Sequence, residues 1–376
     1  MKVNHVLLRN FRNYKTCDLK TGNSVNILYG NNAQGKTNIL EGIYYGAFGI
    51  SHRTSKEEEL LKLEEEGFLV KVNFENNSGE QEIYVKRISG KRTQKEIKYN
   101  SNPIKPKEHY GIFNVVMFSP EDLQIVKGDP ALRRRFLDMD ISQTNKIYYS
   151  LLLKYNKIVK QRNRFLKDSI ERNSFDKIQL DTWDNEFSKV AARIISIRIN
   201  VLEKISEVAV GIYHNIAKNK ENLAIYYEQK LNNSKIQFPK NKSIKEWEEF
   251  YLQLLLERRQ IDRYRATTGI GPHRDDLVFM IDEKVAKAFG SQGQQRTAVL
   301  SVKLAELEYL KQEVGEYPIL LLDDVMSELD VNRREQILGF IDGRVQTFIT
   351  VNDKSLIPKR ECNSYFYIEN GQVKEG

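Results

Sequence analysis

A stretch of eight residues near the N-terminus has the composition and spacing of a phosphate-binding loop. Residues 30–37 read GNNAQGKT and match the pattern GxxxxGK(S/T), and the apolar run VNILYG (25–30) leads into them as a strand would. In such a loop the glycines let backbone N–H groups curl around phosphates, the lysine reaches the β- and γ-oxygens, and the hydroxyl ligates Mg²⁺. The predicted nucleotide contacts are Gly30, Asn31, Asn32, Ala33, Gln34, Gly35, Lys36, Thr37 and Asn38. Of these, Lys36 is also predicted to be catalytic and Thr37 to be a Mg²⁺ ligand.

A second metal-binding group is expected at the end of a neighbouring strand, where the run ILLLDD (319–324) ends in two aspartates. We predict that Asp323 holds Mg²⁺ through water and that Asp324 polarises the attacking water. The alternative is a buried strand capped by solvated aspartates, which the phosphate-binding loop disfavours. The aspartates follow the loop lysine by 323 − 36 = 287 residues, much farther than in small GTPases or simple kinases. No guanine-reading NKxD tetrapeptide occurs in the sequence.

The stretch FGSQGQQRTA (289–298) has the features of a helix N-terminus that holds an anion, although it lacks a lysine. Its glycines loosen the backbone, Ser291 is a natural N-cap, and a helical run follows at 297–310. Such a terminus binds phosphate through its N–H groups and the helix dipole, and it works best on a nucleotide already held elsewhere. The simpler alternative is that Ser291 is only an N-cap.

The order of these motifs resembles that of the ABC class of ATPases. SQGQ matches the serine, second glycine and glutamine of the SGGQ signature, with Gln292 in place of the first glycine, and SELD (327–330) resembles the D-loop. The resemblance implies that ATP is sandwiched in a head-to-tail homodimer. The residues expected to contact the nucleotide from this side are Ser291, Gly293, Gln294 and Asp330.

Hydrophobic periodicity divides the chain into an α/β part and a helical part. Alternating strands are expected at 68–75 and 81–88, and the polar segment 56–67 is expected to be a solvated amphipathic helix, with a partner-binding role as the alternative. After residue 290 the pattern alternates between helix and strand, which indicates a mostly parallel sheet. The expected elements there are a helix, the strand 317–324, the helix 331–342 and the strand 346–353.

Between about residues 119 and 265 helical patterns dominate, with little strand signal. Helices are expected at 141–167 and 183–208, and loops at 168–180 and 232–245. We predict an α/β fold, an ABC-type P-loop ATPase head with a mixed sheet assembled from both chain ends. An inserted helical domain without a long coiled coil completes it, because no heptad pattern persists. The ATP-binding lobe is expected at 1–118 and 316–376, and the mainly helical lobe with the signature at 119–315.

The composition is that of a basic globular protein. The chain has 376 residues and a net charge of +8, which favours an acidic partner such as nucleic acid. No run approaches the roughly 18 apolar residues of a membrane span, and the N-terminus lacks the apolar core of a signal peptide. The two cysteines have no disulfide or zinc spacing, so a cytoplasmic location is expected.

Three basic clusters are candidate contacts for DNA: the hairpin 86–98, the arginine triplet 133–135 and the helix 154–164. Aromatic residues are sparse among them, so phosphate contacts with low sequence specificity are expected. For each cluster a solvated surface is an equal alternative, and the triplet could instead support a loop that faces the nucleotide. The candidate residues are Lys86, Arg87, Lys91, Arg92, Arg133, Arg134, Arg135, Lys154 and Lys157, with Lys160, Arg162 and Arg164 on the same helix.

Several segments resemble one family within this class. LRNFRNY (8–14) is similar to the opening strand and turn of chromosome-maintenance and repair ATPases. The segments 118–138 (FSPEDLQIVKGDPALRRRFLD) and 268–277 (TGIGPHRDDL), with GSQGQQR and LLLDDVMSELD, resemble the RecF family of bacterial recombination mediators. The resemblance implies an ATP-dependent homodimer that binds double-stranded DNA and duplex/single-strand junctions. It also implies work with RecR and RecO to help RecA replace single-strand-binding protein at gaps, and places Arg12 near the nucleotide.

Two residues depart from the ABC pattern at the positions expected to act in catalysis. Asp324 is shorter than the usual glutamate, and Asn352 stands where a histidine usually senses the γ-phosphate. Asn352 remains a predicted catalytic residue, but an amide cannot act as an acid or a base, so we expect slow hydrolysis. With the resemblance to the RecF family, this implies a weak, DNA-stimulated ATPase. A transporter's nucleotide-binding subunit and a structural chromosome-organising head are the alternatives. The basic helical insertion argues against the first and the missing heptad arms argue against the second.

Overall fold

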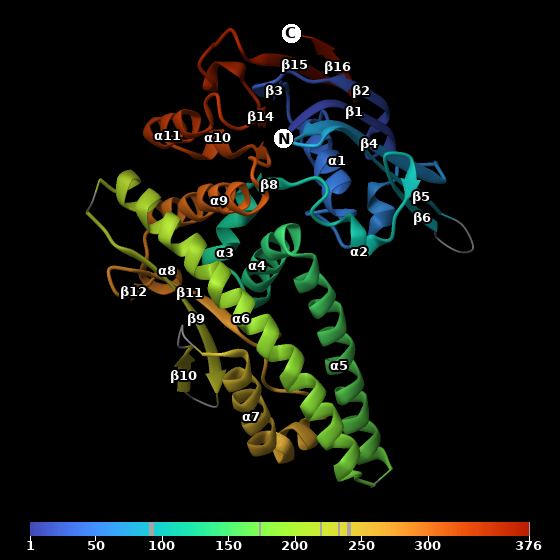
Figure 1. Ribbon diagram of the computed structural model, residues 1–376. Coiled ribbons are helices and arrows are strands. Elements are labelled where there is room, and N and C mark those ends of the chain that lie inside the picture. The colour runs from blue at the N-terminus through green and yellow to red at the C-terminus, as the bar shows by residue number, and fades with distance from the viewer. Residues whose placement is uncertain (90–93, 173, 219, 232–233, 239–241, 376) are drawn as a thin grey trace. The chain divides into compact units, whose positions relative to one another are not determined.

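The computed structural model describes residues 1–89, 94–172, 174–218, 220–231, 234–238 and 242–375 (Figure 1). The chain divides into two compact units, Met1–Asp122 with Glu306–Gly376, and Leu123–Ala305. The sequence-based expectation puts the two junctions after residues 118 and 315. The structure puts the second junction inside a continuous helix, α9 (Gln292–Val314).

The first unit contains a mixed six-stranded sheet in the order β16-β15-β3-β14-β13-β8. All neighbours are parallel except β16, which pairs antiparallel with β15. The strands β3, β13 and β14 are apolar and almost wholly buried, as strands covered on both faces should be. β3 comes from the N-terminal end of the chain and its neighbours β14 and β15 from the C-terminal end (Figure 1), which confirms the predicted sheet assembled from both ends. The bounds are β3 (Val25–Tyr29), β8 (Val115–Phe118), β13 (Ile319–Asp323), β14 (Thr347–Val351), β15 (Ser364–Glu369) and β16 (Gln372–Glu375).

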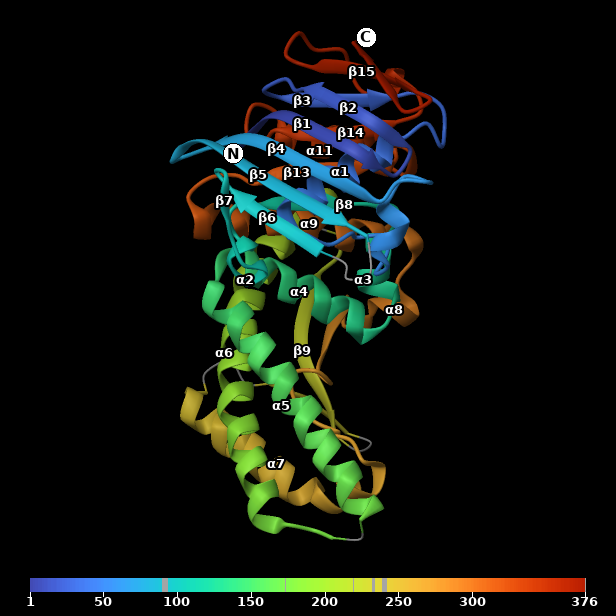
Figure 2. The same cartoon turned by 90° about the vertical axis from the view of Figure 1, so that its right-hand side faces the viewer.

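A second, antiparallel sheet in the same unit has the order β2-β1-β4-β5-β6-β7 (Figure 2). Its long strands alternate between buried and more exposed residues, the period-two pattern of a sheet with one covered face. Helix α1 (Lys36–Phe48) contacts strands of both sheets and is buried along most of its length. The bounds are β1 (Lys2–Phe11), β2 (Tyr14–Lys20), β4 (Gly67–Asn76), β5 (Gly79–Ile88), β6 (Gln94–Tyr99) and β7 (Asn102–Pro103).

The remaining elements of the first unit are short helices, and one of them corrects a prediction. Residues 56–67 do not form an amphipathic helix: only the 3₁₀ turn η1 (Glu57–Leu60) is helical, and β4 begins at Gly67. Tertiary contacts of the glutamates, described below, outweigh the helix propensity of this acidic run. The other elements are α2 (Pro106–His109), η2 (Pro120–Leu123), α10 (Val325–Glu328), α11 (Val331–Ile341) and η3 (Lys354–Leu356).

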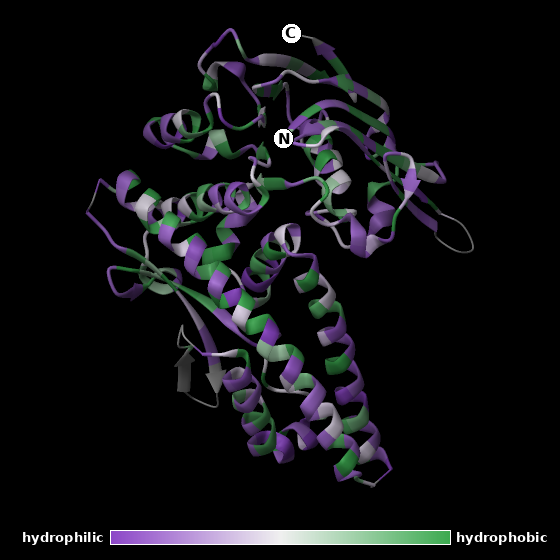
Figure 3. Ribbon diagram, in the orientation of Figure 1, coloured by the Kyte–Doolittle hydropathy of each residue, from purple (hydrophilic) through white to green (hydrophobic). Residues whose placement is uncertain are grey.

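The second unit is built on long helices that pack along one another (Figure 2). Helix α5 (Lys146–Glu171) packs on α6 (Lys177–Ile216), and α6 packs on α7 (Ile244–Arg265). Hydrophobic residues recur at helical spacing among hydrophilic ones along α5 and α6 (Figure 3). Each helix therefore packs an apolar face against its neighbours. The shorter helices are α3 (Gln124–Lys127), α4 (Pro130–Thr144) and α8 (Ala286–Phe289).

The second unit also contains a four-stranded sheet in the order β10-β9-β11-β12. The sequence predicts little strand structure between residues 119 and 265, where β9 and β10 lie. The segment LAIYYEQKL is rich in β-formers, but it stands between a long helical pattern and the polar segment 232–245, which was expected to be a loop. The predicted loop 232–245 contains β10 and the start of α7, so that expectation was wrong in part. The bounds are β9 (Leu223–Leu231), β10 (Ser234–Gln237), β11 (Asp276–Ile281) and β12 (Lys284–Val285). Among the described residues no helix is long and apolar enough to cross a membrane.

Candidate functional site

The predicted phosphate-binding loop lies between β3 and α1, with a backbone that only glycine can adopt at two positions. Gly30 has φ +142° and Gly35 has φ +119°, both in the region disfavoured for other residues. A Cβ atom at Gly30 would lie 2.4 Å from the carbonyl oxygen of Ile368, and one at Gly35 would lie 2.7 Å from the Tyr14 hydroxyl. Because Gly35 is the N-cap of α1, the loop delivers its N–H groups at the positive end of a helix.

Lys36 points back across the loop. Its ammonium group donates to the carbonyl oxygens of Gly30 and Asn31, the latter at 2.8 Å, and to Oδ1 of Asn352 at 2.9 Å. Burial lowers the pKa of Lys36, while the nearby carboxylates of Asp324 and Asp323 act in the opposite direction. The structure therefore brings Lys36 and Asn352, predicted from opposite ends of the chain, into direct contact.

Asp323 ends strand β13 with its carboxylate beside the loop. Its Oδ1 accepts hydrogen bonds from the hydroxyls of Thr37, at 2.8 Å, and Thr350, at 2.7 Å. Burial raises the pKa of Asp323, and these two hydrogen bonds oppose the shift. The pairing of Thr37 with Asp323 is the one that the motifs predict for a shared Mg²⁺ site.

Thr350 was not predicted as a site residue. It lies in β14 opposite Asp323 in the parallel register, and its Oγ1 also accepts a hydrogen bond from the backbone N–H of Asp324 at 2.8 Å. The Thr350 hydroxyl therefore contacts both the carboxylate of Asp323 and the backbone of Asp324. No signal in the sequence marks it, because only the register of β14 on β13 places Thr350 opposite Asp323.

Asp324 leaves the strand with φ +53° and begins α10. Its Oδ1 accepts a hydrogen bond from Ser327 Oγ at 2.5 Å. This left-handed turn directs the second carboxylate away from β13 and into the same cavity as the loop.

The loop and Asp324 border a cavity of about 670 Å³, within the usual range for small-molecule sites. Lys36, Thr37, Asp324 and Asn352 line one part of it. The other lining residues are Arg12, Asn13, Asn32, Ala33, Gln34, Gly35, Asn38, Arg53, Glu58, Glu59, Leu61, Leu63 and Thr350.

Two arginines on this cavity share one buried carboxylate. Arg12 donates through Nε and Nη2 to Glu41 at 2.8 and 2.7 Å, and through Nη1 to the Glu59 carbonyl at 2.7 Å. Arg53, 43% exposed, lies 3.5 Å from Glu41 and donates to Asn38 Oδ1 at 3.1 Å. Burial alone would raise the pKa of Glu41, but hydrogen bonds from Arg12 and Ser51 outweigh it and lower that pKa. Sequence reasoning missed Arg53, which belongs to no recognisable motif.

The predicted signature lies in the other unit, at the N-terminus of α9. Ser291 and Gln294 form a reciprocal cap: Ser291 N donates to Gln294 Oε1 at 2.7 Å, and Gln294 N donates to Ser291 Oγ at 3.2 Å. Ser291 is exposed and Gly293 is half-buried. Asp330 lies outside the cavity lining and caps α11 by accepting from Arg333 N at 3.0 Å. Ser291 and Asp330 are thus helix caps in the single chain, and their contact with a nucleotide stays a prediction.

Comparison with known proteins identifies the family. The profile described as "RecF/RecN/SMC N terminal domain" matches residues 2–374. The chain is 43% identical to the DNA replication and repair protein RecF of Natranaerobius thermophilus, over 99% of this chain and 98% of that protein. It is 40% identical to the protein of the same name from Clostridium tetani, over the whole of both. The chain belongs to the RecF family.

The solved structures agree with this assignment. A structure described as the recombination mediator protein RecF-ATP in the RecFOR pathway superimposes with a TM-score of 0.90 at 37% identity, covering 100% of this chain and 97% of that one. An Smc head domain from Pyrococcus furiosus matches with a TM-score of 0.55 at 16% identity, covering 99% and 95%, and shares the fold alone. The resemblance to the RecF family and the α/β head fold inferred from the motifs are therefore confirmed.

The two segments that carried the resemblance to the RecF family meet inside the second unit. Arg133, from 118–138, donates through Nε and Nη2 to both carboxylate oxygens of Asp276, from 268–277, at 2.6 and 3.0 Å. Arg134 donates to the Asp275 carbonyl at 2.6 Å. His273 is also structural: its Nδ1 lies 2.6 Å from the Tyr155 hydroxyl, and burial lowers the pKa of His273 to about 4.

Several predicted DNA contacts are therefore wrong, because their guanidinium groups are buried in ion pairs. Arg133 pairs with Asp276 as above, and Arg87 is 1% exposed and pairs with Glu57 and Glu58. The remaining candidates in the described part of the chain are the half-buried Lys86 and Arg134 and the exposed Arg135, Lys154, Lys157, Lys160 and Arg164. Of these, Lys154 pairs with Glu186 and Arg164 with Asp168. Lys91 and Arg92 lie outside the described residues.

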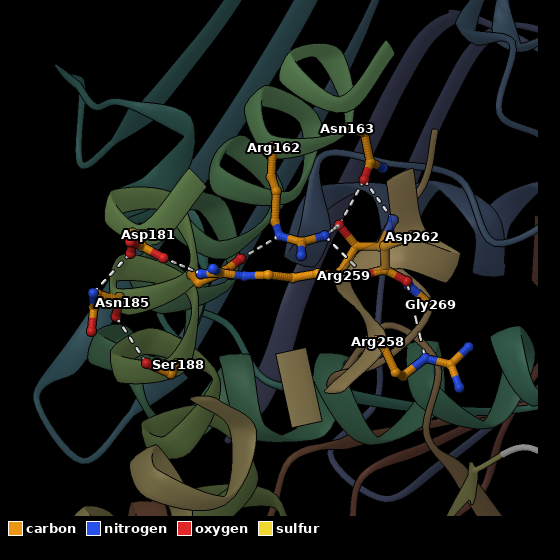
Figure 4. Close-up of polar contacts among 11 residues, drawn as sticks. Arg162, Asn163, Asp181, Asn185, Ser188, Arg258, Arg259, Asp262 and Gly269 are labelled. Carbon is orange, nitrogen blue, oxygen red and sulfur yellow. Dashed lines mark hydrogen bonds and ion pairs between the residues drawn. The ribbon is translucent and has the colours of Figure 1, made fainter. Parts of the chain in front are cut away.

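Arg162, on the same predicted DNA helix, is 0% exposed and central to a polar cluster shown in Figure 4. Its Nε donates to Asp184 at 2.8 Å and its Nη1 to Asp262 at 2.9 Å. Arg259 donates to the other oxygen of Asp184 at 2.8 Å. Since these residues come from α5, α6 and α7, the cluster fixes the three helices to one another.

Proposed function

We propose that this RecF-family chain is an ATP-dependent DNA-binding protein of recombinational gap repair. ATP binding closes a head-to-tail homodimer on duplex or junction DNA, and slow hydrolysis releases it. The observation that carries the proposal is the cavity at which Lys36, Thr37, Asp324 and Asn352 converge, with Asp323 bonded to Thr37. A RecF structure that is described as bound to ATP, with the same fold, supports the choice of nucleotide.

Different groups of the chain bind ATP, activate the attacking water and detect the γ-phosphate. The loop N–H groups and Lys36 hold the phosphates. Asp324, positioned by Ser327 and the αL turn, orients and polarises the attacking water. Asn352, bonded to Lys36, is placed to report whether the γ-phosphate is present. Because an amide cannot relay a proton and Asp324 is short, turnover is slow, and DNA stimulates it.

The oxygens of Thr37 and Asp323 fit Mg²⁺, which prefers hard oxygen ligands and one or two carboxylates supplemented by substrate phosphates. Thr37 would hold the ion directly and Asp323 through water. The ion would neutralise charge that develops on the phosphates.

The second half of the ATP site comes from another copy of the chain. The N-terminus of α9, with Ser291, Gly293 and Gln294, adds N–H donors and a helix dipole to the phosphates of the partner's nucleotide. Exposed cations on the helical unit, such as Lys157, contact DNA phosphates, and RecR and RecO act with the dimer in RecA loading. The RecFOR pathway named for the solved RecF supports the choice of these partners.

Two variants separate the halves of this proposal. Lys36→Met is expected to abolish nucleotide binding, and Ser291→Arg to leave binding intact while preventing ATP-induced dimerisation, measured by light scattering with and without duplex DNA. Dimerisation of the Ser291 variant with ATP would contradict the role of the signature. A turnover above about 10 s⁻¹, the median for enzymes, would contradict slow hydrolysis.

A further inference from the structure

One wall of the nucleotide cavity is a segment without regular structure of its own. Glu58, Glu59, Leu61 and Leu63 line the cavity, and only η1 is helical among residues 57–63. A single 3₁₀ turn has few internal hydrogen bonds and cannot hold its own position. Its contacts with the rest of the first unit must therefore set the shape of this wall.

The backbone of the segment is held on one side by the end of β1 and the turn that follows it. Arg12 N donates to the Leu60 carbonyl at 2.7 Å, and Lys62 N donates to the Asn10 carbonyl at 2.9 Å. The side chain of Leu60 is fully buried. These contacts fix residues 60–62 and leave the glutamates before them to be held by side chains.

Glu57 and Glu58 are held by two cations, Arg87 from β5 and Lys95 from β6, whereas the carbonyl of Glu59 accepts a hydrogen bond from Arg12. Lys95 Nζ lies 2.6 Å from Glu57 Oε1, and Arg87 Nε lies 3.2 Å from Glu57 Oε2. Arg87 also pairs through Nη2 with Glu58. Tyr45, from α1, donates its hydroxyl to Glu57 at 3.0 Å.

Arg87 and Lys95 act as one unit because they are direct neighbours across the two strands. The Arg87 side chain is 2% exposed and the Lys95 side chain is 25% exposed. Lys95 also donates to the Gly49 carbonyl at the C-terminal end of α1, and its ammonium lies 4.9 Å from the ring centroid of Tyr45. The hairpin, α1 and the acidic turn are thus joined at one point.

The same contacts govern the charge of the wall. Glu57, Glu58 and Glu59 are consecutive carboxylates beside a cavity proposed to receive a triphosphate. Like charges a few ångströms apart repel each other, more strongly at the partly buried Glu57 than at the exposed Glu58 and Glu59. Arg87 and Lys95 neutralise two of the three, so their loss would both loosen the wall and leave it repulsive to an anionic nucleotide.

We propose that Arg87 and Lys95 are positioning residues of the nucleotide site. Neither lines the cavity; both act through Glu57 and Glu58, keeping the wall 58–63 in place and its charge low. The inference rests on the proposed function, since it takes ATP as the ligand of the cavity.

Lys95→Gln is the test and Lys98→Gln its matched control. Both lysines lie on β6, are partly exposed (25% and 31%), pair with a glutamate and lie over a tyrosine ring. Each substitution removes one positive charge from the same strand, but the partners of Lys98 are Glu96 and Tyr84, neither of which lines the cavity. Arg87 is unsuitable as the first variant because breaking its buried pairs endangers folding.

We expect Lys95→Gln to raise the Kd for Mg-ATP, measured calorimetrically on the full chain, by about five- to tenfold, as for loss of a charge-assisted contact. Lys98→Gln should stay within about twofold of wild type, as expected for a surface pair. KM for ATP should rise with Lys95→Gln while kcat changes little, because Lys36 and Asp324 are untouched. Lys95→Arg should restore the wild-type values.

A double-mutant cycle tests the route of action. In a Glu57→Gln background, Lys95→Gln should cost less affinity than in wild type, since the two residues act through one contact. Equal effects of the Lys95 and Lys98 variants, or full additivity in the cycle, would overturn the inference. Failure of the wild-type chain to bind ATP would instead overturn the proposed function, and the two failures are distinct.

Discussion

A buried carboxyl group in the second unit should make the stability of this RecF-family protein depend on pH in an unusual direction. Asp275 is 0% exposed; its Oδ2 accepts a hydrogen bond from the Tyr227 hydroxyl at 2.9 Å. Its Oδ1 has no hydrogen-bond partner within the part of the chain that the structure describes. Burial raises the pKa of Asp275 to about 7, although Arg198 opposes the shift. The folded protein therefore holds a proton that an unfolded chain would release.

The direction and size of this pH dependence follow from the linkage between protonation and folding. Asp275 titrates near 3.8 when unfolded and near 7 when folded, so its stabilising contribution is complete below pH 3.8 and is lost as pH rises toward 7. At about 1.36 kcal/mol per pKa unit, the two units between pH 5 and 7 correspond to about 3 kcal/mol of unfolding free energy. Paired carboxylates with lowered pKa values contribute in the opposite direction, so the comparison must be with a variant.

Asp275→Asn removes the titrating group and keeps its shape. The two tryptophans, Trp183 and Trp247, both lie in the second unit, so tryptophan fluorescence during urea unfolding reports on that unit. The difference in unfolding free energy between variant and wild type should shift in favour of the variant by about 3 kcal/mol between pH 5 and 8. Asp168→Asn, at a surface residue of α5, should show no such shift. A variant-to-wild-type difference that is constant across this pH range would refute the reasoning.

Two further outcomes follow from the contacts of single residues. Arg133→Ala leaves the carboxylate of Asp276 buried without its ion-pair partner. The unfolding free energy, measured by tryptophan fluorescence, should therefore fall by about 3–5 kcal/mol. An unchanged unfolding free energy would contradict the importance of this buried pair. Thr350→Val removes the hydroxyl that contacts both aspartates. ATP turnover should fall by about tenfold or more, with little change in the Kd for ATP. Unchanged turnover would show that the contact is dispensable.

The parts of the site that sequence alone could predict are those written in contiguous motifs. The phosphate-binding loop needs glycine at fixed positions, and the aspartates follow an unbroken apolar run, so both the loop and the strand end are visible locally. Thr350 and Arg53 reach the same cavity only through strand register and tertiary packing. No local pattern marks them, and a single sequence gives no register.

The wrong secondary-structure predictions have a common physical cause: long-range contacts outweigh local propensity at these segments. The acidic segment 56–67 has the composition of a helix, but Arg87 and Lys95 draw Glu57 and Glu58 to the hairpin and shorten the helix to one turn. Strand β9 stands between a helical pattern and an expected loop, and its pairing partner β11 lies about fifty residues later along the chain. Neither contact has a signal within a short window of sequence.

The charge clusters show how far composition can mislead about binding. Arginines at the predicted DNA surfaces, Arg87, Arg133 and Arg162, lie inside the fold, each in a multidentate pair with aspartate or glutamate. Arginine suits such buried pairs because its planar fork meets two oxygens at once, whereas a lysine ammonium is more strongly hydrated. Lys154 and Lys157 remain at the surface. Burial therefore separates the arginines that hold the fold together from the exposed cations that remain candidates for phosphate contacts.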